Sequence, residues 1–102
     1  FKENCPDIRN TRIIDIYEEL VEYGCQVDVY DPWANAEEVK HEYGVDILPK
    51  GVVPKQGAYK AIVLCVAHNQ FKDLDIASLK DGDAVVYDVK GILPKDLVDR
   101  RL

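Results

Sequence analysis

The stretch AIVLCVA, residues 61–67, decides the class of fold. It is apolar throughout and lacks the polar alternation of a strand with one face in water. Such a run is typical of a strand that is covered on both faces in a parallel sheet. We therefore predict that residues 61–67 form a central strand, and that the polar residues after it, beginning with His68, lie at one end of the sheet.

Helical and strand patterns alternate on both sides of this strand. Working outward, the apolar spacing and the turn residues predict helices over 11–23, 35–43, 76–79 and 95–101, and strands over 25–30, 45–48 and 84–87. This alternation predicts the α/β class, as an open, mostly parallel, Rossmann-like three-layer sandwich. The first helix, capped by Asn10 or Thr11, would normally follow a strand, so we expect that the first strand of the sheet is missing.

Length and composition set limits on the function. The 102 residues suffice for one domain, 1–102, with its own core. No apolar run approaches the roughly 18 residues that cross a bilayer, and the net charge of -6 repels polyanions. We therefore expect neither a membrane nor a nucleic acid as partner. The three cysteines lie far apart and predict neither a metal site nor a disulfide framework, and the absence of methionine indicates a piece of a longer polypeptide.

Polar or charged residues follow each predicted strand, where ligands of open α/β sheets bind. Lys2, Arg9 and Lys90 are predicted to converge at one edge of an otherwise acidic protein, and such a cluster suits a phosphate-bearing ligand. The N-terminus of the helix near Thr11 also favours an anion beside Arg9. Neither GxGxxG nor a P-loop occurs, so side chains rather than glycine backbone would have to bind the phosphates.

The basic residues also have a local interpretation. Lys2 and Arg9 are alternatively solvated, or paired with nearby acidic residues such as Asp7, and composition alone favours that alternative. Asp88 and Lys90 alternatively form a local ion pair, worth under about 1 kcal/mol if exposed.

For two further polar residues, Asp31 and His68, the sequence allows either a structural or a functional role. Asp31 either holds a ribose hydroxyl, as acidic residues after a second strand do in dinucleotide sites, or forms an Asx turn before Pro32. The turn is the interpretation that the sequence favours. His68 is a helix cap or packing residue, or else a catalytic base. We do not expect catalysis at His68.

Four segments together resemble a known family. FKENCPDIRNT at 1–11, VYDP at 29–32, VAHNQF at 66–71 and DVK at 88–90 resemble, in order and spacing, the C-terminal UDP-binding domain of the UDP-glucose/GDP-mannose dehydrogenase family. The first segment and YDPW at 30–33 look most like the bacterial branch that oxidises UDP-N-acetylhexosamines, such as UDP-N-acetylgalactosamine, for surface polysaccharide synthesis.

The resemblance implies an activity for the parent protein and roles for single residues. The parent would be a cytoplasmic, homodimeric oxidoreductase that oxidises C6 of a UDP-N-acetyl-D-hexosamine, galactosamine or glucosamine, with NAD bound mainly by an N-terminal domain absent here. Phe1, Lys2 and Lys90 would contact the UDP-sugar, and Arg9 would reach the NAD. Lys90 stands at a position where the family frequently has arginine. A lysine keeps the positive charge but lacks the planar guanidinium that makes a bidentate contact.

The resemblance implies no catalytic residue in this chain. The nucleophilic cysteine of the family lies upstream of this domain, and none of Cys5, Cys25 and Cys65 matches its motif. The isolated chain would therefore not turn over. The alternative function is a non-catalytic α/β interaction module, or a module of the response-regulator type, which would require an acidic residue where His68 and Asn69 stand.

Overall fold

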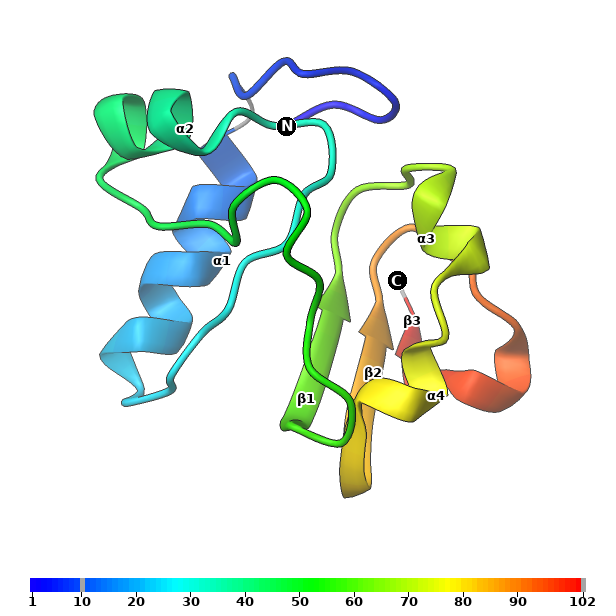
Figure 1. Ribbon diagram of the computed structural model, residues 1–102. Coiled ribbons are helices and arrows are strands. Elements are labelled where there is room, and N and C mark those ends of the chain that lie inside the picture. Colours follow the sequence, from blue (N-terminus) through cyan, green and yellow to red (C-terminus); the bar gives the residue numbers. More distant parts are fainter. Residues whose placement is uncertain (10, 102) are drawn as a thin grey trace. The chain divides into compact units, whose positions relative to one another are not determined.

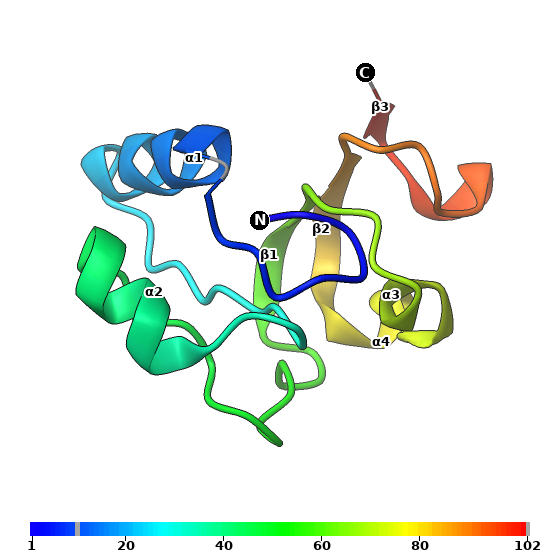
Figure 2. The same cartoon turned by 90° about the horizontal axis from the view of Figure 1, so that it is seen from above.

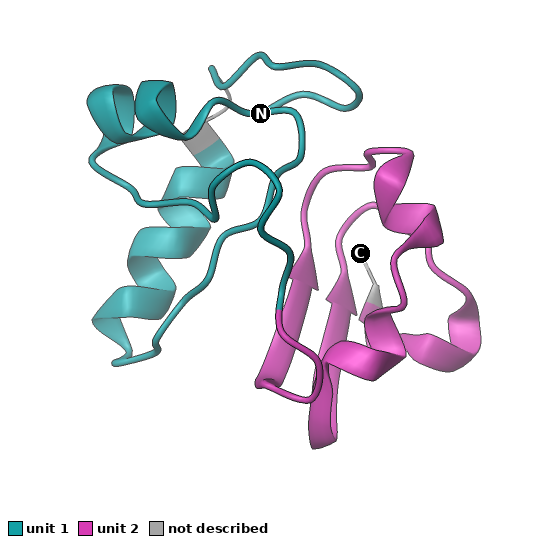
Figure 3. Ribbon diagram, viewed as in Figure 1, with its two compact units in different colours: residues 1–54 teal, residues 55–102 magenta. Residues whose placement is uncertain are grey.

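The computed structural model describes residues 1–9 and 11–101, so the predicted cap Asn10 lies outside the described residues (Figure 1, and from above Figure 2). The chain divides into two compact units, residues 1–54 and residues 55–102 (Figure 3). The named elements of the first unit are helices, and the second unit holds a parallel sheet.

The first unit contains two helices, α1 (Thr11–Glu22) and α2 (Ala36–Tyr43), as the sequence predicts. α2 begins where the Asn35 side chain accepts a hydrogen bond from the Glu38 N–H at 3.0 Å, which caps the first turn. It ends at Gly44, whose φ of 69° is the left-handed conformation that glycine adopts without strain. Both ends of α2 confirm the prediction.

The predicted strands over 25–30 and 45–48 are wrong. The two segments meet through one backbone hydrogen bond, from the Leu48 N–H to the Val29 carbonyl at 2.8 Å, but neither is part of a strand in the described structure. The apolar alternation over 45–48 reflects burial, because its first and third residues lie in the core. A strand needs repeated pairing with a neighbour, which alternation of side chains does not supply.

The second unit is built on a parallel sheet in the order β1 (Tyr59–Leu64), β2 (Lys80–Asp88), β3 (Arg100–Arg101). Two short helices, α3 (Gln70–Asp73) and α4 (Ile76–Leu79), form the connection from β1 to β2 (Figure 1). Parallel strands joined through helices confirm the α/β class. Because β1 and β2 are parallel, their carboxyl ends lie at the same end of the sheet.

β1 is shorter than predicted and lies at one side of the sheet rather than at its centre. Val63 is 40% exposed, so the strand is not covered on both faces as expected. The middle strand is β2, which pairs with β1 on one side and with β3 on the other. An unbroken apolar run cannot reveal which strands flank it, because that depends on the path of the whole chain.

The predicted helix over 95–101 is wrong. Residues Lys95–Leu97 form a single 3-10 turn, and β3 follows. The Asp99 N–H donates to the Val86 carbonyl at 2.9 Å, and Asp99 Oδ2 accepts the Val86 N–H at 2.7 Å. Backbone and side chain of one residue thus tie this segment to β2, whereas so short a helix would gain little by itself.

The core of the second unit draws on the sheet, on α3 and α4, and on the loops that follow the strands. Its buried apolar residues are Leu64, Val66, Phe71, Ile76, Leu79, Ala84, Val86 and Leu93. Within residues 1–9 and 11–101, no helix has both the length and the apolar character to cross a membrane.

Candidate functional site

An open hollow in the first unit is lined by Phe1, Lys2, Asp7 and Arg9. The chain turns back on itself here, and a backbone bridge joins Lys2 to Cys5. The hollow thus gathers three of the four residues for which the sequence predicts contact with substrate or cofactor.

An aromatic contact anchors this hollow to α2. Phe1 is 5% exposed and stacks on Tyr43, with ring centroids 6.2 Å apart and 28° between the ring planes. The Tyr43 hydroxyl donates a hydrogen bond to the carbonyl of Ile8. A single tyrosine in the last turn of α2 therefore holds the N-terminal segment near both of its ends, which fixes the backbone around the hollow.

Asp7 and Arg9 form a two-pronged ion pair at this hollow. Arg9 Nη2 lies 2.7 Å from Asp7 Oδ2, and Arg9 Nε lies 3.0 Å from Asp7 Oδ1. The Arg9 backbone N–H donates to the same Oδ1 at 3.0 Å. The hydrogen bonds from the Arg9 side chain, together with its charge, hold the pKa of the Asp7 carboxyl well below its usual range. The local pairing that composition favoured is confirmed for Arg9.

This pairing orients the guanidinium without enclosing it. The Arg9 side chain is 88% exposed, and its Nη1 takes no part in the fork to Asp7. A guanidinium is planar and carries donors along more than one edge. Asp7 occupies one edge and fixes the plane, so an anionic or hydroxyl-bearing ligand can approach another edge.

Asp31 forms the turn that the sequence favours. Its Oδ1 accepts the N–H groups of Trp33 and Ala34 at 2.9 and 3.0 Å, which is the Asx-turn pattern. The residue as a whole is 9% exposed. The structural interpretation of Asp31 is therefore confirmed.

Lys90 lies at the carboxyl end of the sheet in the second unit. The Val89 N–H donates to the Leu64 carbonyl at 3.0 Å, so the β1–β2 pairing continues up to the residue before Lys90. Burial raises the pKa of the Cys65 thiol, and Lys90 opposes that rise, so the ammonium lies within electrostatic range of the sulfur. The exposed Lys90 is therefore near the end of β1, where ligands of parallel sheets bind.

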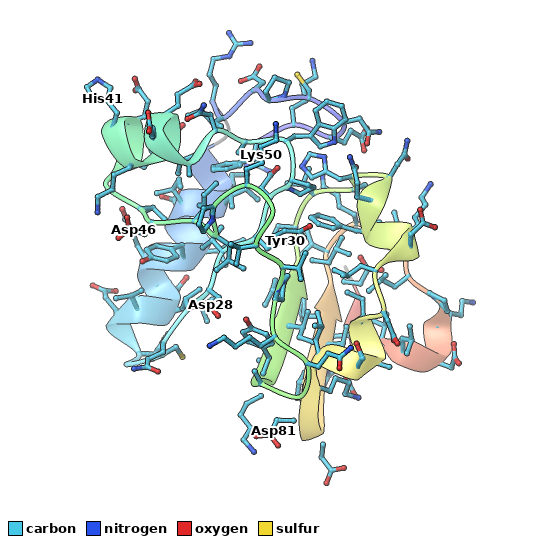
Figure 4. All side chains as sticks on the ribbon, viewed as in Figure 1. Asp28, Tyr30, His41, Asp46, Lys50 and Asp81 are labelled. Atoms are coloured by element: carbon cyan, nitrogen blue, oxygen red, sulfur yellow. The ribbon has the colours of Figure 1, made fainter. Side chains whose placement is uncertain are left out.

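The opposite end of this sheet carries an ordinary surface ion pair. Lys60 Nζ lies 2.9 Å from Asp81 Oδ2 near the amino ends of β1 and β2, and Figure 4 labels Asp81 there. Both side chains are largely in water, where such a pair contributes little to stability. In the described part of the chain no ion pair occupies Lys90, so its charge is available to a ligand.

Asp88, the last residue of β2, is fully buried and binds the loop that follows it. Its Oδ1 accepts the N–H groups of Lys90 at 3.1 Å and Gly91 at 2.8 Å, and its Oδ2 accepts the Leu93 N–H at 2.8 Å. The sequence left a local ion pair between Asp88 and Lys90 open as an alternative, and the structure instead shows the carboxylate bound to the backbone N–H of Lys90.

His68 is a packing residue in this structure. Its ring is fully buried and meets Phe71 edge to face, with centroids 5.3 Å apart and 62° between the planes. Its carbonyl accepts the Phe71 N–H at 3.0 Å at the start of α3. These contacts agree with the structural interpretation of His68 and not with a catalytic base open to substrate.

The sequence-predicted site is thus only partly assembled. The first unit brings Phe1, Lys2 and Arg9 together, whereas Lys90 belongs to the second unit. The convergence of all the cations on one ligand therefore stays a prediction. Over the described ranges, no group of three or more His, Cys, Asp and Glu side chains is arranged to hold a metal ion.

The sequence pattern of the UDP-glucose/GDP-mannose dehydrogenase family, UDP binding domain, matches residues 1–95. The chain belongs to this family, as the resemblance of its segments indicated. It is a UDP binding domain of the nucleotide-sugar dehydrogenase kind, and the alternative of a response-regulator-like or interaction module is not favoured. No solved structure matches the chain significantly.

Among curated proteins, the UDP-N-acetyl-D-glucosamine 6-dehydrogenases of Pseudomonas aeruginosa and Salmonella typhi are each 51% identical over all of this chain. Protein CapL of Staphylococcus aureus is 37% identical over 94% of it. The chain spans about a quarter of the length of these relatives, between 22% and 24%. Both dehydrogenases are named for the glucosamine epimer.

Two structural residues of the site were missed from the sequence. The sequence indicates Asp88 only as an ion-pair partner and Tyr43 only as the end of a helix. An Asp followed by a glycine three positions later is a turn signal, so Asp88 with Gly91 could have indicated the loop anchor. Nothing local in the sequence marks Tyr43 as the partner of Phe1, because the two are distant along the chain.

Proposed function

We propose that this chain is the UDP-sugar-binding domain of a bacterial, NAD-dependent UDP-N-acetyl-D-hexosamine 6-dehydrogenase that serves surface polysaccharide synthesis. The observation that carries the proposal is the 51% identity, over the full chain, with two UDP-N-acetyl-D-glucosamine 6-dehydrogenases. Their printed names favour the glucosamine epimer, and galactosamine is the alternative. Because the reaction needs NAD, we place the parent protein in the cytoplasm. We also propose that the parent protein is a homodimer.

Recognition of the UDP-sugar is assigned to Phe1, Lys2 and Lys90. Both lysines are exposed, and each brings a compact positive charge that suits a diphosphate. Phe1 is held against Tyr43, so the backbone beside Lys2 is fixed before the ligand arrives. Such contacts hold the diphosphate of the substrate, so their loss is expected to raise the KM for the UDP-sugar.

Contact with NAD is assigned to Arg9. When bound, NAD would accept hydride from the sugar, and the rest of the parent protein would supply most of its site. The residues present here fit an accessory contact: Asp7 fixes the plane of the Arg9 guanidinium while its side chain remains exposed. That geometry suits a phosphate or a ribose oxygen of the dinucleotide.

No catalytic residue is assigned within this chain. Its work is binding, so we expect the 102-residue chain alone to bind UDP-sugars weakly and to oxidise none. NMR titration of the chain with UDP, UDP-N-acetylglucosamine and NAD tests this. Amide shifts should move at Lys2 and Lys90 with either uridine ligand, and at Arg9 with NAD. Calorimetric binding of the UDP-sugar at micromolar affinity or better would contradict the expectation of a weak half-site.

The complete polypeptide that carries this domain provides the test of the reaction. With UDP-N-acetylglucosamine it should form two NADH per sugar, because oxidation of an alcohol to a carboxylate removes four electrons. UDP-N-acetylgalactosamine assayed in parallel decides the epimer, and UDP-glucose serves as the control without an acetamido group. A polypeptide that reduces NAD with neither UDP-N-acetylhexosamine would overturn the proposed function, whatever it does with UDP-glucose.

A further inference from the structure

The loop after β2 is shaped by one buried carboxylate. Of the five backbone N–H groups at residues 89–93, three donate to Asp88, and a fourth, that of Val89, continues the pairing with β1. Gly91 has a φ of 69°, in the left-handed region that glycine enters without strain. This turn lets N–H groups from successive residues point toward the same carboxylate.

Converging amides of this kind form a concave nest that binds anions in many proteins. In this loop Asp88 fills the nest from within, so the engaged N–H groups point to a protein carboxylate instead of a ligand. What the loop offers to an external anion is therefore the side chain of Lys90. The backbone N–H of Lys90 is one of the groups that donate to Asp88. The residue that carries the cation is therefore bound directly by the buried carboxylate.

We propose that Asp88 is a positioning residue for substrate binding, whose carboxylate holds loop 89–93 in the shape that presents the Lys90 ammonium to the diphosphate of the UDP-sugar. This inference rests on the proposed function, because it takes Lys90 as a substrate contact. Asp88 touches no ligand itself, since it is fully buried. Because the N–H groups of the loop surround the Asp88 carboxylate, its negative charge does not face the diphosphate.

The first test compares Asp88→Asn with the wild type in the complete polypeptide. Asparagine has the same shape and keeps one oxygen acceptor, but it turns an NH₂ group toward an N–H donor of the loop. We expect the KM for the UDP-sugar to rise about tenfold, with kcat and the KM for NAD within about twofold of wild type. If Asp88→Asn does not fold, Asp88→Glu keeps the charge and displaces the carboxylate by one methylene, and it should give a smaller rise in the same KM.

A double-mutant cycle separates positioning from general damage. If Asp88 acts through Lys90, then adding Asp88→Asn to Lys90→Ala should raise the KM for the UDP-sugar by less than about twofold beyond Lys90→Ala alone. If Asp88 only supports the fold, the two effects should multiply. Multiplication would overturn the proposal.

Asp99→Asn is the control for loss of a carboxylate outside the loop, at a residue that is exposed rather than buried. Asp99 also accepts a backbone N–H, that of Val86 at 2.7 Å, and lies in the same unit but outside loop 89–93. We expect it to leave the KM for the UDP-sugar within about twofold of wild type. Amide hydrogen exchange gives a readout without activity, because the N–H groups of Lys90 and Gly91 should exchange faster in Asp88→Asn and not in Asp99→Asn.

The outcomes distinguish this inference from the proposed function. A wild-type polypeptide that neither binds nor oxidises UDP-sugars would overturn both, and that result needs no variant. A wild type that oxidises them, with a folded Asp88→Asn of unchanged KM, would overturn the positioning role alone. Unchanged exchange at Lys90 and Gly91 in Asp88→Asn would overturn the anchoring of the loop.

Discussion

In the first unit the carboxylate of Asp7 binds the guanidinium of Arg9 directly, whereas in the second unit Asp88 binds the backbone of the loop that carries Lys90. A guanidinium can give one edge to a carboxylate and keep another for a ligand. An ammonium is a point charge, and a direct carboxylate partner would compete with the ligand for it. The comparison teaches that a planar cation can be oriented through its side chain, but a lysine is better oriented through its main chain.

The two contacts also differ in what they contribute to stability. The Arg9 side of the Asp7–Arg9 pair lies in water, where solvent and salt screen its charge, whereas the Asp7 side chain is 20% exposed. Asp88 is buried and accepts three backbone N–H groups, so removing its carboxylate takes an acceptor away from each of them. The contact of Asp7 with Arg9 therefore mainly orients the guanidinium. The contact of Asp88 with loop 89–93 both orients the loop and stabilises the fold.

The largest effect should come from Asp88→Ala. We expect the free energy of unfolding to fall by about 3 kcal/mol, because three N–H groups lose the buried carboxylate that accepts them. Asp7→Ala should lower the urea midpoint by much less, because the Arg9 side chain that Asp7 binds is 88% exposed. Urea unfolding of both variants at neutral pH measures the contrast. Equal losses from the two substitutions would break the comparison.

A smaller effect, about tenfold in KM, should separate the two cations in the complete polypeptide. Arg9→Ala should raise the KM for NAD and spare that for the UDP-sugar, and Lys90→Ala should do the reverse. Lys90→Arg keeps the charge and should stay close to wild type. Steady-state kinetics with each substrate varied in turn decides this. Variants that each raise both KM values equally would show that the two cations do not serve separate ligands.

The pH dependence of the Asp7–Arg9 pair follows from the direction of its pKa shift. The pKa of Asp7 is lower in the folded than in the unfolded chain, so the pair's contribution is complete above the unfolded pKa of an aspartate and is lost as pH falls through the lowered one. Carboxyl-carbon NMR should show Asp7 titrating below the usual range of an aspartate. In Arg9→Gln the titration should return toward the usual range. An Asp7 that titrates normally in the wild type would show that the fork does not persist in solution.

The smallest effect concerns Cys65, which reports the position of Lys90. Because Lys90 opposes the rise in the pKa of the Cys65 thiol, Lys90→Ala should raise that pKa further and slow alkylation of Cys65 at a given pH. Mass spectrometry of peptides after timed iodoacetamide labelling measures it, with the exposed Cys25 as internal control. Unchanged labelling of Cys65 would place the ammonium away from the end of β1.

Local patterns predicted much of this molecule correctly. The caps Asn35 and Gly44, the Asx turn at Asp31 and the pairing of Arg9 with Asp7 each depend on atoms within a few residues of one another. Four short segments were enough to indicate the family that the match over residues 1–95 shows. The errors concern pairing: the strands expected over 25–30 and 45–48 are absent, and β3 replaces an expected helix.

The sequence by itself determined the α/β class, the ends of α2 and the family. Only the tertiary structure decided that β1 lies at one side of the sheet, that Phe1 stacks on Tyr43 and that Asp88 anchors the Lys90 loop. The physical reason is one of range. Caps, short turns and periodicity are set by neighbours in sequence, whereas burial and strand pairing depend on where distant segments meet. A buried carboxylate accepts hydrogen bonds from whichever donors the fold places around it.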